Sequence, residues 1–302
     1  MLPPPPLRTH VGLRLNTFQP ATKPVVPSIG PWELVRQVHE GAMFRVHQVR
    51  PLERDSASTA GYALKELLPR WDHVPAAIEL LAVESLVGRT VSDPHLVAVL
   101  SSELAEKPRY VVTPWLQGET LAAIVRRGRL KVPQALWIVR QLVEALRALH
   151  AAGWLHGDVK PDNVLVSPRG HVTLIDLGFA RRIGERVTSF DDCLRFTATY
   201  APPEITGSQP PDVRSDLYSV GVTLYETLTG HPPFYAPRVD ELLRMHREDR
   251  PQDLRMLASD VPSDVAKLAH QLLAKDPLRR PHSAADLIDE LINLEIATFD
   301  QR

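Results

Sequence analysis

Two clusters of polar residues, one on each side of a pair of short predicted strands, constrain this sequence more than any other feature. The first reads H-G-D-V-K-P-D-N at 156–163, and the second reads D-L-G at 176–178. Between them, β-favouring runs at 164–167 and 172–175 flank a Pro-Arg-Gly turn, which predicts a hairpin. The fold must therefore place both polar clusters on loops at strand ends, where functional side chains are common.

The side chains in these clusters suit the transfer of a phosphoryl group. Such a transfer needs a carboxylate that orients the attacking hydroxyl and accepts its proton. It also needs a cation on the transferred phosphate and oxygen ligands for Mg²⁺. These requirements are met by Asp158, Lys160, Asn163 and Asp176.

The chain changes character from strands to helices near Gly118. Before it, strands are predicted at 32–38, 44–49, 61–67, 96–100 and 110–115, and one helix is predicted at 75–87. After it, helices are predicted at 133–150, 215–229, 240–245, 264–273 and 283–293. The predicted fold class is α+β, with a mostly β lobe at about 32–116 and a mostly helical lobe at about 117–296.

The two ends of the chain are predicted to lie outside these lobes. Residues 1–31 contain eight of the 28 prolines and no acidic residue, which predicts an extended or disordered tail. A tail of this composition is either a solvated leader or a docking segment for a partner that binds proline-rich chains. Residues 297–302 are predicted to form a short C-terminal tail.

Composition excludes several classes of protein. The 35 Lys and Arg residues balance 36 Asp and Glu residues, which argues against nucleic-acid binding by bulk charge. A single cysteine excludes a disulfide-rich secreted scaffold and fits a reducing compartment. We find neither a signal peptide nor an apolar run long enough to span a membrane. The sequence therefore predicts a cytoplasmic protein without a membrane span.

The motifs, taken in order, resemble those of protein kinases, and most closely those of bacterial Hanks-type (eukaryotic-like) Ser/Thr kinases. That family shows H-R-D with an Asn five residues on, D-F-G, a lysine on the third strand and A-P-E. This chain has H-G-D, D-L-G, A-L-K at 63–65 and P-P-E at 202–204. S-D-L-Y-S-V-G at 215–221 and R-R-P at 279–281 also resemble family segments. The resemblance covers about residues 32–295 and implies a two-lobe, ATP-dependent kinase acting on Ser or Thr of a protein substrate.

The resemblance also implies roles for the charged residues. Asp158 would be the catalytic base, Lys160 would contact the γ-phosphate, and Asn163 and Asp176 would hold Mg²⁺ or, alternatively, Mn²⁺. Lys65 would hold the α- and β-phosphates and pair with a helix glutamate. Spacing favours Glu84 for that glutamate over the rival Glu79. Structural roles would fall to Asp216 and to the Glu204–Arg280 pair.

The adenine site and the acceptor site follow from the same alignment of motifs. Thr113 resembles the gatekeeper, Pro114 and Leu116 belong to the hinge, and the N–H of Leu116 would contact adenine. The residues that would enclose the ring are Val38, Val46, Ala63 and Leu165. Thr197 would bridge Asp158 and Lys160, which favours Ser/Thr over Tyr acceptors.

The glycine-rich loop departs from the family pattern. Where the family shows G-x-G-x-x-G-x-V, this chain reads H-E-G-A-M-F-R-V at 39–46 and keeps only Gly41 and Val46. His39 and Phe44 stand in for glycines, and Glu40 adds a negative charge that we expect near ATP. This loop favours an alternative function as a pseudokinase scaffold, whereas the complete set of charged catalytic residues favours an active enzyme.

Gly157 is a second departure, because the family usually has Arg before the catalytic Asp. That Arg binds a phosphorylated activation-loop residue, so we expect activity here without activation-loop phosphorylation. H-G-D also occurs in small-molecule kinases of the aminoglycoside and choline type. Lys160 and the 200–221 segment argue against that third function.

Overall fold

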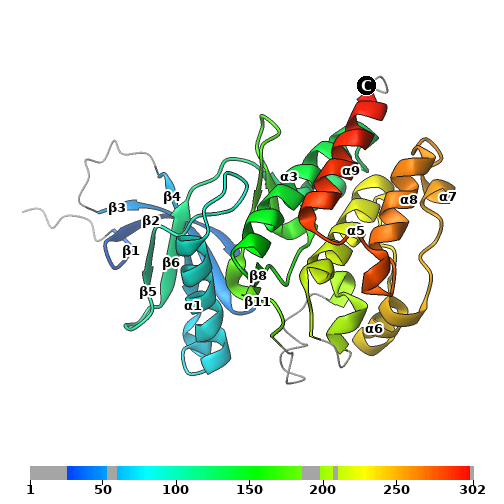
Figure 1. Cartoon of the computed structure of the whole chain (residues 1–302). Helices are drawn as coiled ribbons and strands as arrows, with labels where there is room; N and C mark the ends of the chain where they lie inside the picture. The colour runs from blue at the N-terminus through cyan, green and yellow to red at the C-terminus, as the bar shows by residue number, and fades with distance from the viewer. Residues whose placement is uncertain (1–25, 53–59, 186–197, 207–209, 300–302) are drawn as a thin grey trace, which may run out of the picture.

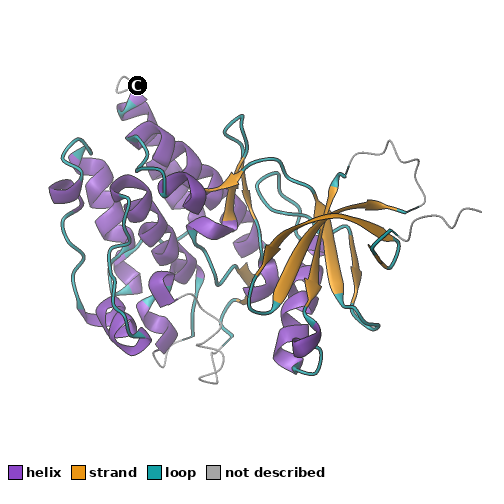
Figure 2. Cartoon of the chain, turned by 180° about the vertical axis from the view of Figure 1, so that it is seen from behind, coloured by secondary structure: helices purple, strands orange, loops and turns teal. Residues whose placement is uncertain are grey.

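Two lobes, one mostly strand and one mostly helix, lie side by side in the computed structural model of this chain (Figure 1). The structure describes residues 26–52, 60–185, 198–206 and 210–299. The view from behind shows the orange strands gathered in one lobe and most of the purple helices in the other (Figure 2). This arrangement confirms the predicted α+β class.

The N-terminal lobe is built on a six-stranded antiparallel sheet in the order β1-β2-β3-β4-β6-β5. Its strands are β1 (Ser28–Ile29), β2 (Trp32–Glu40), β3 (Phe44–Pro51), β4 (Tyr62–Leu67), β5 (Ser101–Glu103) and β6 (Tyr110–Pro114). One face packs on helix α1 (Pro75–Thr90) through a cluster that includes Leu67, Leu81 and Val111. Since strand side chains alternate between faces, the neighbouring residues point to the outer side of the sheet.

The outer face has its own small apolar cluster, which the sequence did not predict. Ile29 packs there with Val49, Leu64, Tyr110 and Val112. Ile29 belongs to β1, which pairs with the start of β2. The sheet therefore begins at Ser28, a few residues before the boundary that we expected at Trp32; residues 1–25 of the predicted tail lie outside the described residues.

The predicted strand at 96–100 is wrong. In the structure this segment runs from the end of α1 to the next strand, β5, which begins at Ser101. Leu96, Val97 and Val99 are buried, because the segment packs against other elements, and the N–H of Leu100 bonds to Val112 of β6 just before β5 begins. The N–H of Val97 bonds to the carbonyl of Leu174, and the N–H of Val99 bonds to the carbonyl of Gly88. A buried apolar run is compatible with both arrangements, so its pattern alone could not separate them.

The C-terminal lobe is mostly helical. Its helices are α2 (Leu121–Val125), α3 (Val132–Ala151), α5 (Val213–Thr229), α6 (Val239–Glu248), α7 (Leu254–Leu257), α8 (Ser263–Leu272) and α9 (Ala284–Ala297). Short strands are β7 (Glu119–Thr120), β8 (Trp154–Leu155), β9 (Val164–Val166), β10 (Val172–Leu174) and β11 (Arg181–Arg182). Short 3₁₀ segments lie at Pro69–Trp71, Pro161–Asn163, Leu177–Phe179, Ala198–Tyr200, Pro203–Thr206 and Pro277–Arg279.

Helix α3 forms the centre of this lobe. Its predicted apolar stripe is fully buried at Leu136, Val139, Leu142, Val143, Leu146 and Leu149. The helix packs against α5, α9 and the β9–β10 hairpin. Burial of each such side chain contributes about 1.5–3 kcal/mol relative to exposure, so the stripe fixes the platform on which the polar loops stand.

The main apolar core crosses from one lobe to the other. It includes Val87 and Val91 at the end of α1 as well as the α3 stripe and Leu177. The end of α1 is therefore packed against the C-terminal lobe near the second polar cluster. No helix within the described residues has both the length and the apolar character needed to cross a membrane.

Candidate active site

The β9–β10 hairpin brings the two polar clusters together, as the sequence predicted. Its strands pair in register from Val164–Leu174 to Val166–Val172. At its base, the N–H of Ile175 donates to the carbonyl of Asn163 at 2.9 Å. Asp176, the residue after Ile175, therefore lies close to Asn163, the last residue of the first cluster.

Asp158 is buried and held by its own loop. The Nζ atom of Lys160 lies 2.6 Å from its Oδ2 atom. The Nδ2 atom of Asn163 donates both to the Asp158 carbonyl at 2.8 Å and to Oδ2 at 3.0 Å. Burial raises the pKa of Asp158 above its ordinary value, and the Lys160 ammonium opposes that rise only in part. Three of the predicted catalytic residues thus form one hydrogen-bonded group.

Asp216 of α5 binds the backbone of this loop. Its carboxylate accepts hydrogen bonds from the N–H groups of His156 and Gly157, at 2.9 and 3.0 Å. It also lies 2.8 Å from Nε2 of His150. Burial alone would raise the pKa of Asp216, but the hydrogen bond with His150 and the nearby imidazoles lower it. The carboxylate therefore stays charged and fixes the backbone next to Asp158; the sequence did not indicate the contribution of His150.

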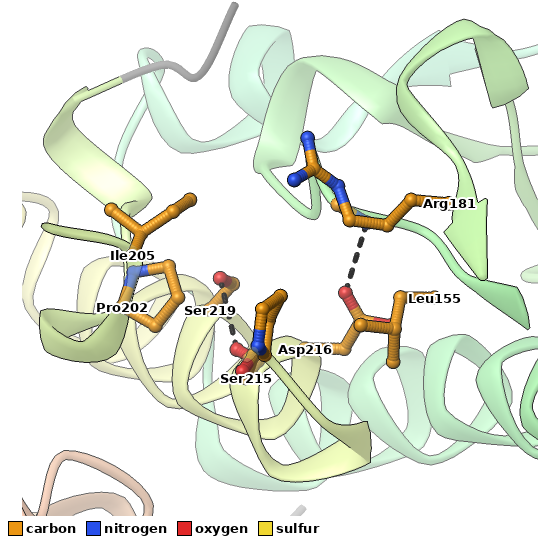
Figure 3. A pocket seen from close by; sticks show the side chains of 9 residues that line it. Leu155, Arg181, Pro202, Ile205, Ser215, Asp216 and Ser219 are labelled. Atoms are coloured by element: carbon orange, nitrogen blue, oxygen red, sulfur yellow. Dashed lines mark hydrogen bonds between the residues drawn. The ribbon is translucent and has the colours of Figure 1, made fainter. Parts of the chain in front are cut away.

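Gly157 adopts a backbone conformation that favours glycine. Its φ is +76°, and a Cβ atom there would lie 2.6 Å from the carbonyl oxygen of Phe179. Figure 3 shows a pocket beside this loop, where Asp216 and Ser219 of α5 face Leu155 and Arg181. The glycine that departs from the family pattern is thus explained by a positive φ and by a close backbone approach.

Lys65 of β4 joins the two lobes through two carboxylates. Its Nζ atom lies 2.8 Å from Oε2 of Glu84 and 2.7 Å from Oδ1 of Asp176. Burial disfavours the charged form of Lys65, but the carboxylates of Asp176 and Glu84 outweigh it and raise the Lys65 pKa. Burial would raise the pKa of Asp176, yet Lys65 lowers it. For Glu84, burial dominates and raises the pKa.

The position of α1 explains why Glu84, and not its rival Glu79, forms this ion pair. Glu84 lies on the buried face of α1, together with Leu80, Leu81 and Gly88.

Gly88 allows α1 to lie close to the segment that follows it. A Cβ on Gly88 would lie 2.6 Å from Cγ2 of Val99. A larger residue at this position would push α1 away from the segment that follows it.

Asn163 and Asp176 offer oxygen atoms that suit a magnesium ion. Because the amide nitrogen of Asn163 is bonded to Asp158, the side-chain carbonyl oxygen is the group left to bind a metal. Asp176 has a φ of +64°, and its carboxylate is partly exposed. Carboxylate and amide oxygens are the ligands that Mg²⁺ prefers. Within the described residues there is no cluster of three or more His, Cys, Asp or Glu side chains that could hold a different metal.

The residues predicted around adenine lie on strands of both lobes and in the segment that joins the lobes. Ala63 pairs with Thr113, and Val46 pairs with Lys65, so these side chains share the face of the sheet that carries Lys65. Val38 is exposed at a bulge in β2. Pro114 ends β6, Leu116 packs against the main core, and Leu165 lies in β9. Thr197 lies outside the described residues.

The predicted Glu204–Arg280 pair is present and buried. Its two hydrogen bonds measure 2.7 and 2.9 Å, and the Arg280 side chain is fully enclosed. Arg280 also donates to the carbonyls of Arg214 and Ala274, each at 2.8 Å. Ser215 of α5 donates to Glu204. The pair therefore ties the segment at 203–206 to α5 and to the end of the chain.

The Glu40 side chain in the β2–β3 turn does not lie where we expected it. Glu40 pairs with Arg45 across the hairpin at 2.7 Å. Arg45 in turn contacts Glu66, whose neighbour Lys65 points to the opposite face. The negative charge of Glu40 thus lies on the outer face and is neutralised there, which corrects our expectation of a like charge near ATP.

Phe44 contributes a contact that we did not predict. The centre of its ring lies 4.6 Å from Nζ of Lys65. The alternation of β3 and its register with β4 place Phe44 and Lys65 on one face, so this signal was present once the strand pairing was known.

Comparison with known proteins agrees with this geometry. The model of the protein kinase domain family matches residues 32–292. A probable serine/threonine-protein kinase, pknA2 of Bifidobacterium longum, is 30% identical over 267 residues, which cover 88% of this chain and 35% of that protein. PknB of Mycolicibacterium smegmatis is 30% identical over 270 residues, covering 87% of this chain and 43% of that protein.

PknD of Mycobacterium tuberculosis is 29% identical over 269 residues, which cover 88% of this chain and 40% of the relative. This chain therefore spans less than half the length of these three relatives. The family match, by contrast, takes in both polar clusters, Lys65, Glu84 and the buried Glu204–Arg280 pair. The chain belongs to the protein kinase family and is similar to its bacterial serine/threonine-protein kinases.

Proposed function

We propose that this chain transfers the γ-phosphoryl group of ATP to a Ser or Thr hydroxyl of a protein substrate. One observation carries the proposal: Lys65 is bonded to both Glu84 and Asp176, while Asp158, Lys160 and Asn163 form a hydrogen-bonded group beside Asp176, at the base of the β9–β10 hairpin. Phosphoryl transfer depends on positioning and charge, and this arrangement supplies both.

Each charged residue has a distinct task in this proposal. The Asp158 carboxylate orients the acceptor hydroxyl and takes its proton, since it is the buried acceptor at the centre of its loop. Lys160, 2.6 Å from Asp158, neutralises charge on the transferred group. Lys65 holds the α- and β-phosphates.

Asn163 and Asp176 are the residues that would hold Mg²⁺. When bound, the ion neutralises charge on the phosphates and fixes their orientation. A magnesium ion on the Asp176 carboxylate would compete with Lys65 for the same oxygen atoms.

The choice of acceptor and the mode of activation are finer parts of the proposal. The names of the relatives and the lysine at position 160 support a Ser/Thr acceptor. With Gly157 in place of Arg, the catalytic loop carries no guanidinium there to bind a phosphorylated activation loop. We infer that the chain does not require such phosphorylation, and that it is of the non-RD type.

A pseudokinase scaffold with weakened nucleotide binding is the second candidate, and the β2–β3 turn favours it. The Phe44 ring covers one side of Lys65, and the Gly41 N–H donates within the turn to Phe44 at 2.9 Å. Both features reduce the number of hydrogen-bond donors that a triphosphate could contact. The catalytic group at Asp158 is nevertheless complete, which is why we favour activity.

The deciding experiment measures transfer from radiolabelled ATP with Mg²⁺ to the chain itself and to a general protein acceptor. The Asp158→Asn variant serves as the control, and phosphoamino-acid analysis identifies the acceptor. Phosphoserine or phosphothreonine in the wild type alone supports the proposal. Nucleotide binding without transfer would instead support a scaffold, and transfer only to aminoglycosides or choline would support a small-molecule kinase.

A further inference from the structure

The register of the β2–β3 hairpin determines which face each loop side chain occupies. His39 of β2 pairs with Val46 of β3, and Val46 pairs with Lys65 of β4. Directly paired residues in antiparallel strands project from the same face. His39, Val46 and Lys65 therefore form one row across the sheet, on the face from which Lys65 reaches Asp176.

Two backbone groups of the turn have partners within the lobe. The N–H of Gly41 donates to the carbonyl of Phe44 at 2.9 Å. The carbonyl of Ala42 accepts from Nη2 of Arg70 and Nε1 of Trp71, at 2.9 and 2.8 Å. The tip is thus fastened to the segment that leads into α1, and the Gly41 amide is used inside the turn.

Lys65 is already surrounded in the structure. An ammonium group has three N–H donors. Glu84 and Asp176 each take one, and the Phe44 ring faces the ammonium from 4.6 Å. The ring is itself packed against the apolar cluster beneath α1, so it is part of the wall of the site. One ammonium N–H of Lys65 is then left for a triphosphate, so a further donor from the turn would strengthen its binding.

His39 is the side chain placed to be that donor. It is exposed, and its Nε2 atom lies 3.4 Å from the position that a Cβ on Gly41 would occupy, so the ring lies next to Gly41. Among the described residues, the imidazole ring of His39 has no hydrogen-bond partner. Its neighbour Glu40 points to the other face and is paired with Arg45.

We propose that His39 binds a phosphate group of the nucleotide, so that an imidazole N–H does the work of the backbone amides in a glycine-rich loop. The inference rests on the proposed function, because it assigns the phosphates to the face that carries Lys65. It explains how a chain with only one of the family's three loop glycines would still bind a triphosphate: with a side chain in place of backbone amides.

Calorimetric titration of the full chain with Mg-ATP, Mg-ADP and adenosine tests the inference. His39→Ala should weaken binding of both nucleotides about tenfold, the loss expected for one hydrogen bond to a charged group, and leave adenosine binding within about twofold. His39→Asn keeps a side-chain N–H and should recover part of the affinity. Glu40→Ala is the matched control on the opposite face and should bind all three as the wild type does.

The possible failures are distinguishable. If the wild type binds Mg-ATP and His39→Ala binds it equally well, the inference is wrong and the proposed function stands. Equal losses for ATP and adenosine would also overturn it, because they would indicate a distorted turn. Nucleotide binding that depends on His39, but without phosphoryl transfer, would contradict only the proposed function; a wild type that binds no nucleotide would contradict both.

Discussion

Gly157 and Phe179 approach each other so closely that the loop at 156–163 has no room for a side chain between them. The missing Cβ of Gly157 would lie 2.6 Å from the carbonyl oxygen of Phe179, which is well inside van der Waals contact. The glycine also has a φ of +76° and donates its N–H to Asp216. Two separate constraints, one steric and one conformational, thus act at the residue before Asp158.

Substitution of Gly157 should therefore lower the free energy of unfolding by more than substitution of a glycine that has a positive φ but no close neighbour. Gly230, at the end of α5, has a φ of +85° and open space around its missing Cβ. We expect Gly230→Ala to lower the free energy of unfolding by about 1–2 kcal/mol. Gly157→Ala should lower it by at least about 1 kcal/mol more, because the backbone must also move away from Phe179. Urea denaturation measures both; equal losses would show that the clash relaxes freely.

Asp158→Asn should abolish transfer and leave the fold intact. The amide cannot accept the hydroxyl proton, so we expect the rate to fall by about 10²–10⁴. Lys65, Glu84 and Asp176 are unchanged in this variant, so binding of Mg-ATP should persist. Single-turnover kinetics and nucleotide titration check the two parts; a rate near that of the wild type would remove Asp158 from its assigned role.

Lys65 and Glu84 should be energetically coupled. Lys65→Met leaves the buried Glu84 carboxylate next to Asp176 without its cation, which destabilises the chain. Adding Glu84→Gln removes that uncompensated charge. The double variant should thus be more stable than Lys65→Met alone by about 1 kcal/mol or more, although both should lack activity. If the second substitution brings no recovery in thermal denaturation, the pair contributes little to stability.

His246 should make stability depend on pH. Its Nδ1 atom lies 2.8 Å from the hydroxyl of Tyr218, and its carbonyl accepts from Lys275 at 2.6 Å. Burial, together with the Lys275 charge, lowers the pKa of His246 from 6.5 to about 4. The unfolded chain therefore takes up a proton first as the pH falls, and stability that is present above pH 6.5 is lost towards pH 4.

At pH 5 this loss should be about 2 kcal/mol relative to pH 7. The His246→Gln variant carries no titrating group at this position and should lose correspondingly less stability over the same interval. Denaturation curves at the two pH values, compared between the wild type and the variant, isolate the contribution of this residue. Parallel losses in both proteins would place the acid sensitivity elsewhere.

The sequence predicted the parts of the fold that depend on local pattern. The α3 stripe, the β9–β10 hairpin and the order of the two lobes follow from periodicity and turn residues, and the Lys65–Glu84 pair follows from family spacing. The strand at 96–100 failed, because a buried apolar run does not reveal whether its backbone pairs with a sheet or with Leu174 and Gly88.

The contacts that modify the site depend on three-dimensional register. The outward position of Glu40 requires knowing that it pairs with Arg45, and the Phe44 ring can be placed on Lys65 only once β3 and β4 are aligned. Similarly, the support that His150 gives to Asp216 joins residues that are 66 positions apart. None of these relationships can be read from spacing along the chain.

The carbonyl of Ala42 accepts hydrogen bonds from both Arg70 and Trp71, so the tip of the β2–β3 turn should move together with the segment that precedes α1. Trp71 continues through a hydrogen bond to Val74, where α1 begins, and α1 carries Glu84. A compound that displaces α1 should thus move the β2–β3 turn at the same time as it separates Glu84 from Lys65. We therefore expect a compound bound at α1 and a compound bound at the proposed nucleotide site to weaken each other's binding, even where the two compounds are not in contact.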